Sequence, residues 1–239
     1  SPAGRPHRIQ AWLFLTLFAL LLVRQGKPYY LAPAYPLLFA AGAVQFERWT
    51  RAHTGWRWGY AGALAGLALV LAPATLPLLP LPQMNRYTGA VTGGIIEPYE
   101  LTAEYHRQHG YREIAEAVQQ VYRGLPPDQR ARTVALCSSY SKASALDIWR
   151  DALDLPPVHS GHMTWWLWGP PPDTAETFIL VYGDPEALGE FFGDVEVVHV
   201  FDHPLAPPYE RGGAIVVCQD RLHPWSDLWP RVQRYRHAG

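Results

Sequence analysis

Three stretches in the first third of the chain contain no charged residue, and each is apolar over most of its length. An α-helix rises 1.5 Å per residue, so about 20 apolar residues cross a hydrocarbon core of roughly 30 Å. The third stretch contains several prolines, which should end its helix near residue 79. We therefore predict three transmembrane helices, which cover about 9–23, 29–46 and 58–79.

The first stretch has two alternative interpretations. It is short enough for a signal peptide, but no small-residue cleavage site follows it, and two more apolar stretches do. Arg8 and Arg24 at its ends can extend their guanidinium groups to the membrane surface. A buried hairpin is disfavoured, because the second and third stretches are apolar around their whole circumference.

After residue 99 the pattern becomes an alternation of helical and strand-like segments. Apolar residues in 111–123 recur at helical spacing, and 133–140 is a short apolar run that is typical of a buried strand. Further strands are expected at 177–182, 195–201 and 214–218, and further helices at 141–153, near 186–192 and at 225–235. This alternation predicts a small Rossmann-like α/β domain with a mixed or parallel sheet. No glycine-rich nucleotide loop follows any of these strands.

Charge divides the chain at the same place as hydropathy. Residues 1–85 hold seven basic residues and one acidic residue, whereas 86–239 hold thirteen basic and twenty acidic residues, which gives net charges of +6 and −7. This asymmetry indicates two environments, a membrane part and a separate domain. It excludes a simple cytosolic enzyme, and the acidic second part excludes nucleic acid as a partner, because it would repel phosphates.

Three arginines in the loop 47–57 predict the orientation, because short basic loops stay on the cytoplasmic side. The following helix then leads outward and places 86–239 outside the cytoplasm. We therefore expect an integral membrane protein, with transmembrane helices in 1–85 and an extracytoplasmic α/β domain in 86–239. The turn 24–28 is an exception, since it is basic but lies on the outer side in this arrangement.

Ten histidines raise the question of a metal site. Zinc needs three or four ligands that converge from fixed elements. None of the closely spaced pairs has the carboxylate of an H-E-x-x-H helix, so we expect structural or surface histidines and no metal centre. The pairs are His106 with His109, His159 with His162, and His199 with His203.

The two cysteines, Cys137 and Cys218, each lie in a predicted strand. An oxidising compartment would permit a disulfide between them. They would pair only if their strands were neighbours in the sheet, and we therefore favour two buried thiols. The disulfide remains the alternative.

The segment 157–172 concentrates aromatic and histidine side chains in a loop between two predicted elements. Such platforms can contact a sugar or lie at a membrane interface. The alternative is that the indoles pack the loop onto the sheet. The candidate contacts to a sugar or acceptor are His159, His162, Trp165, Trp166 and Trp168.

The run 27–36 (KPYYLAPAYP) combines one of only two lysines in the chain with three tyrosines and three prolines at the start of a membrane stretch. A lysine beside tyrosine hydroxyls at the mouth of a membrane cavity suits a phosphate head group. Interfacial anchoring by the same side chains is the alternative.

Four segments together resemble the C-terminal part of bacterial membrane glycosyltransferases of the protein-mannosyltransferase-like class, glycosyltransferase family 39 with the GT-C fold. They are GKPYYLAPAYPLLFAAGAV, SYSKASALDIW, LPPVHSGHMTWWLWGP and PWSDLWPRVQRY. The resemblance implies an enzyme that moves a sugar from a polyprenyl-phosphate carrier to an extracytoplasmic acceptor. It implies that Lys27, Tyr29 and Tyr30 lie near the carrier phosphate. It implies no cofactor in this chain, with the polyprenyl-phosphate sugar as the donor substrate, and a location in the bacterial inner membrane.

The chain departs from the family in two respects. Relatives often have Gly-Glu-Ala-Gly where this chain has Ser-Lys-Ala-Ser at 141–144. Their catalytic acid lies in an outer loop far upstream, and nothing here matches it, so we expect the catalytic residues and a further transmembrane part before this chain. A non-catalytic, membrane-anchored periplasmic module for sensing or assembly is the alternative.

We predict that Lys27→Ala in the complete enzyme lowers turnover about tenfold or more. A charge-assisted hydrogen bond contributes about 1.5–3 kcal/mol, and 1.4 kcal/mol corresponds to a factor of ten. Tyr29→Phe and Tyr30→Phe should cost less, because each removes one hydroxyl only. Donor affinity and turnover with a polyprenyl-phosphate sugar are the measurements. Unchanged values for Lys27→Ala would assign this run to interfacial anchoring.

Overall fold

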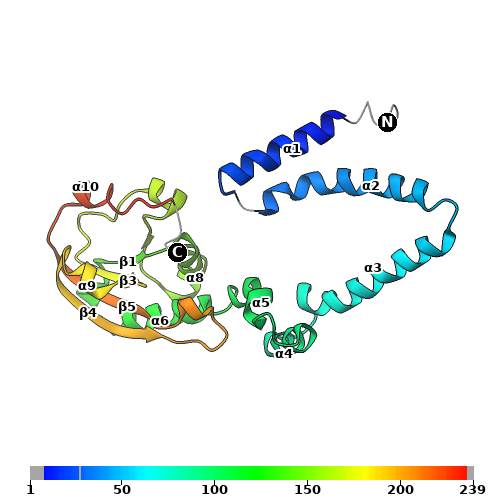
Figure 1. Ribbon diagram of the computed structural model, residues 1–239. Helices are drawn as coiled ribbons and strands as arrows, with labels where there is room; N and C mark the ends of the chain where they lie inside the picture. The colour runs from blue at the N-terminus through cyan, green and yellow to red at the C-terminus, as the bar shows by residue number, and fades with distance from the viewer. Residues whose placement is uncertain (1–7, 27, 236–239) are drawn as a thin grey trace. The chain divides into compact units, whose positions relative to one another are not determined.

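The computed structural model describes residues 8–26 and 28–235 and divides into two compact units (Figure 1). The first unit is Ser1–Ala72 and the second is Pro73–Gly239. The division falls inside the last turns of a long helix, thirteen residues before the boundary that charge and hydropathy predict at residue 85.

The first unit consists of apolar helices whose residues are almost all exposed. Its elements are α1 (Arg8–Val23), the 3₁₀ helix η2 (Pro28–Ala34), α2 (Tyr35–Trp49) and α3 (Thr54–Thr75). No residue of α1, α2 or α3 is buried. Apolar helices that are exposed on all sides are not stable in water, so their surroundings must be supplied by lipid or protein.

The prediction of three transmembrane helices is wrong. Among the described residues, α3 alone is long and apolar enough to cross a membrane. The 16 residues of α1 rise only about 24 Å. The stretch 29–46 does not form one helix, because Pro33 and Pro36 lack the N–H that an α-helical ladder requires and divide it between η2 and α2.

A side-chain network closes the turn between α2 and α3. The hydroxyl of Thr50 donates to the carbonyl of Phe46 at 2.8 Å and ends α2. Arg57 donates to the Thr50 hydroxyl at 3.2 Å and to the carbonyl of Glu47 at 3.0 Å. One arginine thus satisfies the last polar groups of α2 from the first turn of α3.

The second unit contains a five-stranded mixed sheet in the order β2-β1-β3-β5-β4. β1 pairs in parallel with β2 and β3, whereas β5 is antiparallel to both β3 and β4. The strands are β1 (Thr133–Cys137), β2 (Val158–His159), β3 (Thr177–Val181), β4 (Phe192–Phe201) and β5 (Gly213–Arg221). The helices are α4 (Leu81–Thr92), α5 (Pro98–His106), α6 (Tyr111–Gly124), α7 (Pro127–Arg130), α8 (Tyr140–Leu153), α9 (Pro185–Leu188) and α10 (Trp225–Leu228), with 3₁₀ helices η3 (Met163–Trp168) and η4 (Pro208–Glu210).

This unit also differs from the small domain that the sequence predicts. The runs at 133–140, 177–182, 195–201 and 214–218 coincide with β1, β3, β4 and β5, but β2 lies unpredicted inside the aromatic segment. Two further helices, α4 and α5, belong to the same compact unit. The predicted terminal helix is a single turn, because Pro230 interrupts it.

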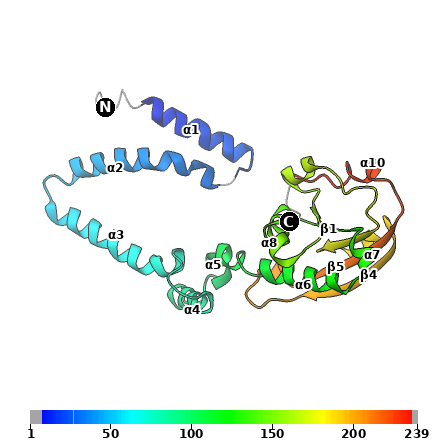
Figure 2. The same cartoon turned by 180° about the vertical axis from the view of Figure 1, so that it is seen from behind.

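Different layers cover the two faces of the sheet (Figures 1 and 2). On one face α6 and α8 bury Ile114, Val118 and Leu146 against β1, β3 and β5. On the other face the chain after β5 covers the sheet with apolar side chains that include Trp225 and Trp229. The helix α6 is strongly amphipathic, which explains why one side of it is fully buried.

The two cysteines lie on opposite faces of the sheet. Cys137 of β1 packs in the layer under α6 and α8, and Cys218 of β5 packs in the layer under α10. Both are free and buried, as expected for two thiols and not for a disulfide. Burial raises the pKa of each thiol to about 12.

We predict that neither thiol reacts with a water-soluble disulfide reagent at pH 8 in the folded protein, because both are buried and protonated. Two equivalents should react after unfolding in guanidinium chloride. The measurement is a thiol titration under non-reducing conditions with and without denaturant. Fewer than two reactive thiols in denaturant would reveal a disulfide and contradict this packing.

Candidate functional site

The carboxyl ends of β1, β2 and β3 meet at one edge of the sheet, where the chain reverses its direction of winding. From β1 the chain moves to β2 on one side and then returns to β3 on the other. Such a switch point leaves a crevice outside the carboxyl ends of the strands, which is where open α/β sheets bind ligands. The residues that follow these strands are therefore the first candidates for a site.

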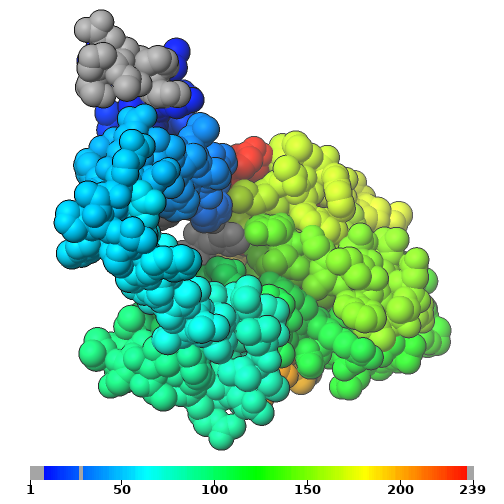
Figure 3. Space-filling model, turned by 90° about the vertical axis from the view of Figure 1, so that its right-hand side faces the viewer, coloured from blue at the N-terminus to red at the C-terminus, as the bar shows by residue number. Residues whose placement is uncertain are grey.

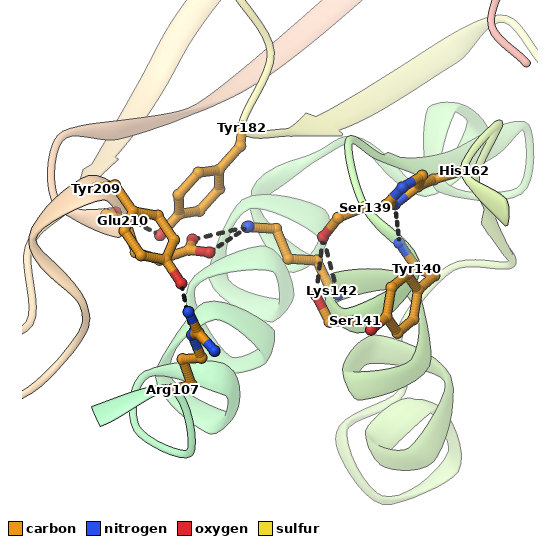
Figure 4. Close-up of polar contacts among 9 residues, drawn as sticks. All are labelled: Arg107, Ser139, Tyr140, Ser141, Lys142, His162, Tyr182, Tyr209 and Glu210. Carbon is orange, nitrogen blue, oxygen red and sulfur yellow. Dashed lines mark hydrogen bonds and ion pairs between the residues drawn. The ribbon is translucent and has the colours of Figure 1, made fainter. Parts of the chain in front are cut away.

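The centre of this edge is a buried ion pair between Lys142 and Glu210 (Figure 4). Lys142 lies in the first turn of α8 and is 5% exposed. Its Nζ is 2.9 Å from one carboxylate oxygen of Glu210 and 2.7 Å from the other. The same ammonium group lies 4.2 Å from the centroid of the Tyr182 ring, so a carboxylate and an aromatic face share its charge.

Tyr182 links β3 to the segment that carries Glu210. Its hydroxyl donates to the backbone carbonyl of Glu210 at 2.8 Å. Burial, together with the nearby carboxylate, raises the pKa of this phenol. Its ring occupies the space where a Cβ on Gly213 would stand, so only glycine fits at the start of β5. Tyr182 is thus held rigidly beside the ion pair.

Hydroxyl groups line the start of α8. Ser139 is the N-cap and accepts from the backbone N–H of Lys142 at 3.4 Å, and its Oγ lies 3.0 Å from that of Ser141. Tyr111, at the start of α6, is hydrogen bonded to Ser141, and burial raises the pKa of its phenol. Three hydroxyls from two helices therefore lie beside the ion pair.

His162 completes the edge from the side of β2. Its Nδ1 accepts from the backbone N–H of Tyr140 at 3.2 Å, and the two rings are 5.3 Å apart. Ser160 donates to the carbonyl of Cys137 at 2.9 Å and accepts from the N–H of His162. The N–H groups of Tyr140 and Lys142 at the start of α8 are thus bonded within the protein.

The tryptophans of the aromatic segment have different environments. Trp165 is buried and donates to the Ser144 hydroxyl at 3.1 Å, which holds η3 beside α8, as Figure 3 shows in green to yellow-green. Trp166 and Trp229 each donate to the other's carbonyl, at 2.9 and 3.1 Å. Trp168 is 70% exposed with its ring 4.2 Å from that of Trp165. Only Trp168 of these three presents its ring to a ligand.

The remaining predicted residues are not brought to this edge as one group. His159 is half-buried, with its Nδ1 3.3 Å from the carbonyl of Gly169, and burial lowers its pKa. Lys27 lies outside the described residues. Tyr29 and Tyr30 belong to η2 of the first unit, are largely exposed, and pack edge to face at 4.8 Å.

The sequence did not predict Lys142, Glu210 and Tyr182 as site residues. One signal for Lys142 was present, since it is the second of two lysines in the chain and directly follows a strand and its N-cap. Glu210 carried no such signal, because 68 residues separate it from its partner. Within the ranges 8–26 and 28–235, no group of three or more His, Cys, Asp or Glu is placed to hold a metal ion.

Comparison with known proteins adds no relative. No family model, curated protein or solved structure matches this chain. The geometry of the site and the sequence resemblance are therefore the basis for a function.

We predict that Lys142→Met lowers the free energy of unfolding by about 3 kcal/mol, because it leaves a mostly buried carboxylate without its cation. The double variant Lys142→Met/Glu210→Gln should recover most of this loss, since no buried charge remains. Arg132→Met, which breaks an exposed pair with Glu176, is the control and should cost less than about 1 kcal/mol. Chemical unfolding followed by tryptophan fluorescence measures the stability of all three variants. A Lys142→Met variant as stable as the wild type would contradict a buried pair.

Proposed function

We propose that this chain is part of a membrane glycosyltransferase that moves a sugar from a polyprenyl-phosphate carrier to an acceptor outside the cytoplasm. The observation that carries the proposal is α3, a 22-residue apolar helix with no buried residue, on the same chain as an α/β unit with a polar edge. A lipid-linked donor requires an enzyme held at the membrane. The resemblance of four segments to family 39 supports the same chemistry.

The charges beside α3 support the orientation. Arg48, Arg51 and Arg57 lie before or at the start of this helix, which favours the cytoplasmic side for that end. Trp56 and Trp58 are more than 70% exposed in its first turns, as side chains at a membrane interface would be. In this orientation the second unit lies outside the cytoplasm, where a polyprenyl-phosphate sugar presents its head group.

The polar edge favours a donor without a nucleotide. The loop between β1 and α8 is Ser138 and Ser139, and neither position offers the glycine that a pyrophosphate needs for close approach of the backbone. The groups that do lie there are hydroxyls and one ion pair, which suit the hydroxyl groups of a sugar or acceptor.

The roles in this proposal divide between the two units. Lys27, Tyr29 and Tyr30 bind the carrier phosphate, and the α/β unit contributes to the acceptor side, with Trp168 as an exposed aromatic contact. A base upstream of this chain deprotonates the acceptor hydroxyl, which attacks the anomeric carbon and displaces the lipid phosphate.

The experiment measures transfer of labelled sugar to membrane-bound acceptors by the full-length protein in its native membranes, with a panel of polyprenyl-phosphate hexoses and pentoses. We expect the protein to transfer sugar from one donor of this panel. Trp168→Ala should then lower the initial rate about fivefold, as expected for loss of about 1 kcal/mol of aromatic contact. Leu167→Ala, an equally exposed neighbour, is the matched control and should leave the rate unchanged. No transfer from any donor would favour the non-catalytic module.

A further inference from the structure

The loop that carries Glu210 is held at its middle by two histidines. This loop, residues 202–212 between β4 and β5, is called the strap below. The backbone N–H of Leu205 donates to Nδ1 of His203 at 3.2 Å. The carbonyl of the same residue lies 2.8 Å from Nδ1 of His106 on α5. The backbone N–H and the carbonyl of Leu205 are therefore each bound by an imidazole ring.

These contacts require the two rings to be opposite tautomers. Nδ1 of His203 must be without a proton to accept, so its proton is on Nε2, 3.6 Å from a carboxylate oxygen of Glu113. Nδ1 of His106 must carry its proton, because a carbonyl only accepts. A proton added to Nδ1 of His203 would remove the acceptor of Leu205, whereas His106 would keep its donor.

The surroundings oppose more than one positive charge. The ring of His109 stacks on that of His203 with centroids 6.1 Å apart, and burial, followed by the His203 charge, lowers the pKa of His109. Glu113 is the carboxylate nearest to His203. Besides His109, the titratable and charged groups at these rings and at the middle of the strap are Glu113 of α6, Tyr99 of α5, and Arg211 of the strap itself, which donates to the carbonyls of Pro204 and Ala206. Arg107 and Tyr209 lie beside Tyr99.

The strap also connects this cluster to the ion pair. Ala206 is fully buried next to Leu205, and Arg107 donates to the Tyr209 hydroxyl at 3.2 Å. Glu210 follows and pairs with Lys142. The middle of the strap and Glu210 therefore belong to one short segment, which Arg211 also holds by donating to the carbonyls of Pro204 and Ala206.

We propose that the strap is an acid-sensitive latch, in which protonation of His203 at Nδ1 breaks its bond to Leu205 and frees the segment that positions Glu210 at the candidate site. This inference rests on the fold alone and does not require sugar transfer. The hydrogen bond to Leu205 exists only while Nδ1 of His203 is unprotonated, so acid weakens the closed strap. An extracytoplasmic unit would experience such acidification directly.

Hydrogen exchange of the full-length protein in nanodiscs, at pH 7.5 and pH 5.5 and corrected for intrinsic rates, tests the latch. The peptide over 202–212 should exchange about tenfold faster at pH 5.5, which corresponds to about 1.4 kcal/mol of opening free energy. Peptides over β1 and β3 should remain protected at both pH values, because opening is local.

The variant His203→Asn separates protonation from structure. An asparagine side-chain oxygen can accept from the N–H two residues later, as Nδ1 of His203 does, but it does not titrate. This variant should stay closed at both pH values. The control His223→Asn changes an exposed histidine for which the structure gives only a backbone contact, and it should respond like the wild type. Exchange that is independent of pH in the wild type would overturn the proposal. So would a His203→Asn strap that still opens with acid or is open at both pH values.

Discussion

The buried pair of Lys142 and Glu210 is the interaction on which the arrangement of the α/β unit depends. Removing two charges from water is costly, and the cost is offset only where geometry is good and further polar contacts are made. Here the ammonium contacts both carboxylate oxygens and the Tyr182 face, and Tyr182 in turn holds the backbone of Glu210. The first turn of α8, the end of β3 and the loop between β4 and β5 are therefore bound to one point.

The same loop extends this constraint to α5. Three consecutive residues at the end of α5 each contact a different part of the second unit. Tyr105 donates to the carbonyl of Thr75 at 2.6 Å, His106 binds Leu205, and Arg107 binds Tyr209. Thr75 is the last residue of α3. Hydrogen bonds thus connect the candidate site to Thr75, near the start of the second unit, and protonation of His203 acts on the middle of this connection.

Strands were predictable because their signal is local. The runs around β1, β3, β4 and β5 are short and apolar and are bounded by polar or turn residues. The helices of the first unit were not predictable in the same way. An absence of charge predicted 29–46 as one span, but Pro33 and Pro36 divide it, and backbone hydrogen bonding decides helix length more strictly than hydropathy does.

The sequence by itself determined the two-part character of the chain, the positions of most strands and the burial of both thiols, because each follows from hydropathy and local spacing. It also singled out the aromatic segment, although side-chain packing assigns Trp165 and Trp166 to contacts within the protein and leaves Trp168 exposed. Only the tertiary structure decided that Lys142 meets Glu210 and that His203 and His106 share Leu205. Lys142 and Glu210 are 68 positions apart and His106 and Leu205 are 99 apart, and no local pattern encodes which loop folds back onto which helix.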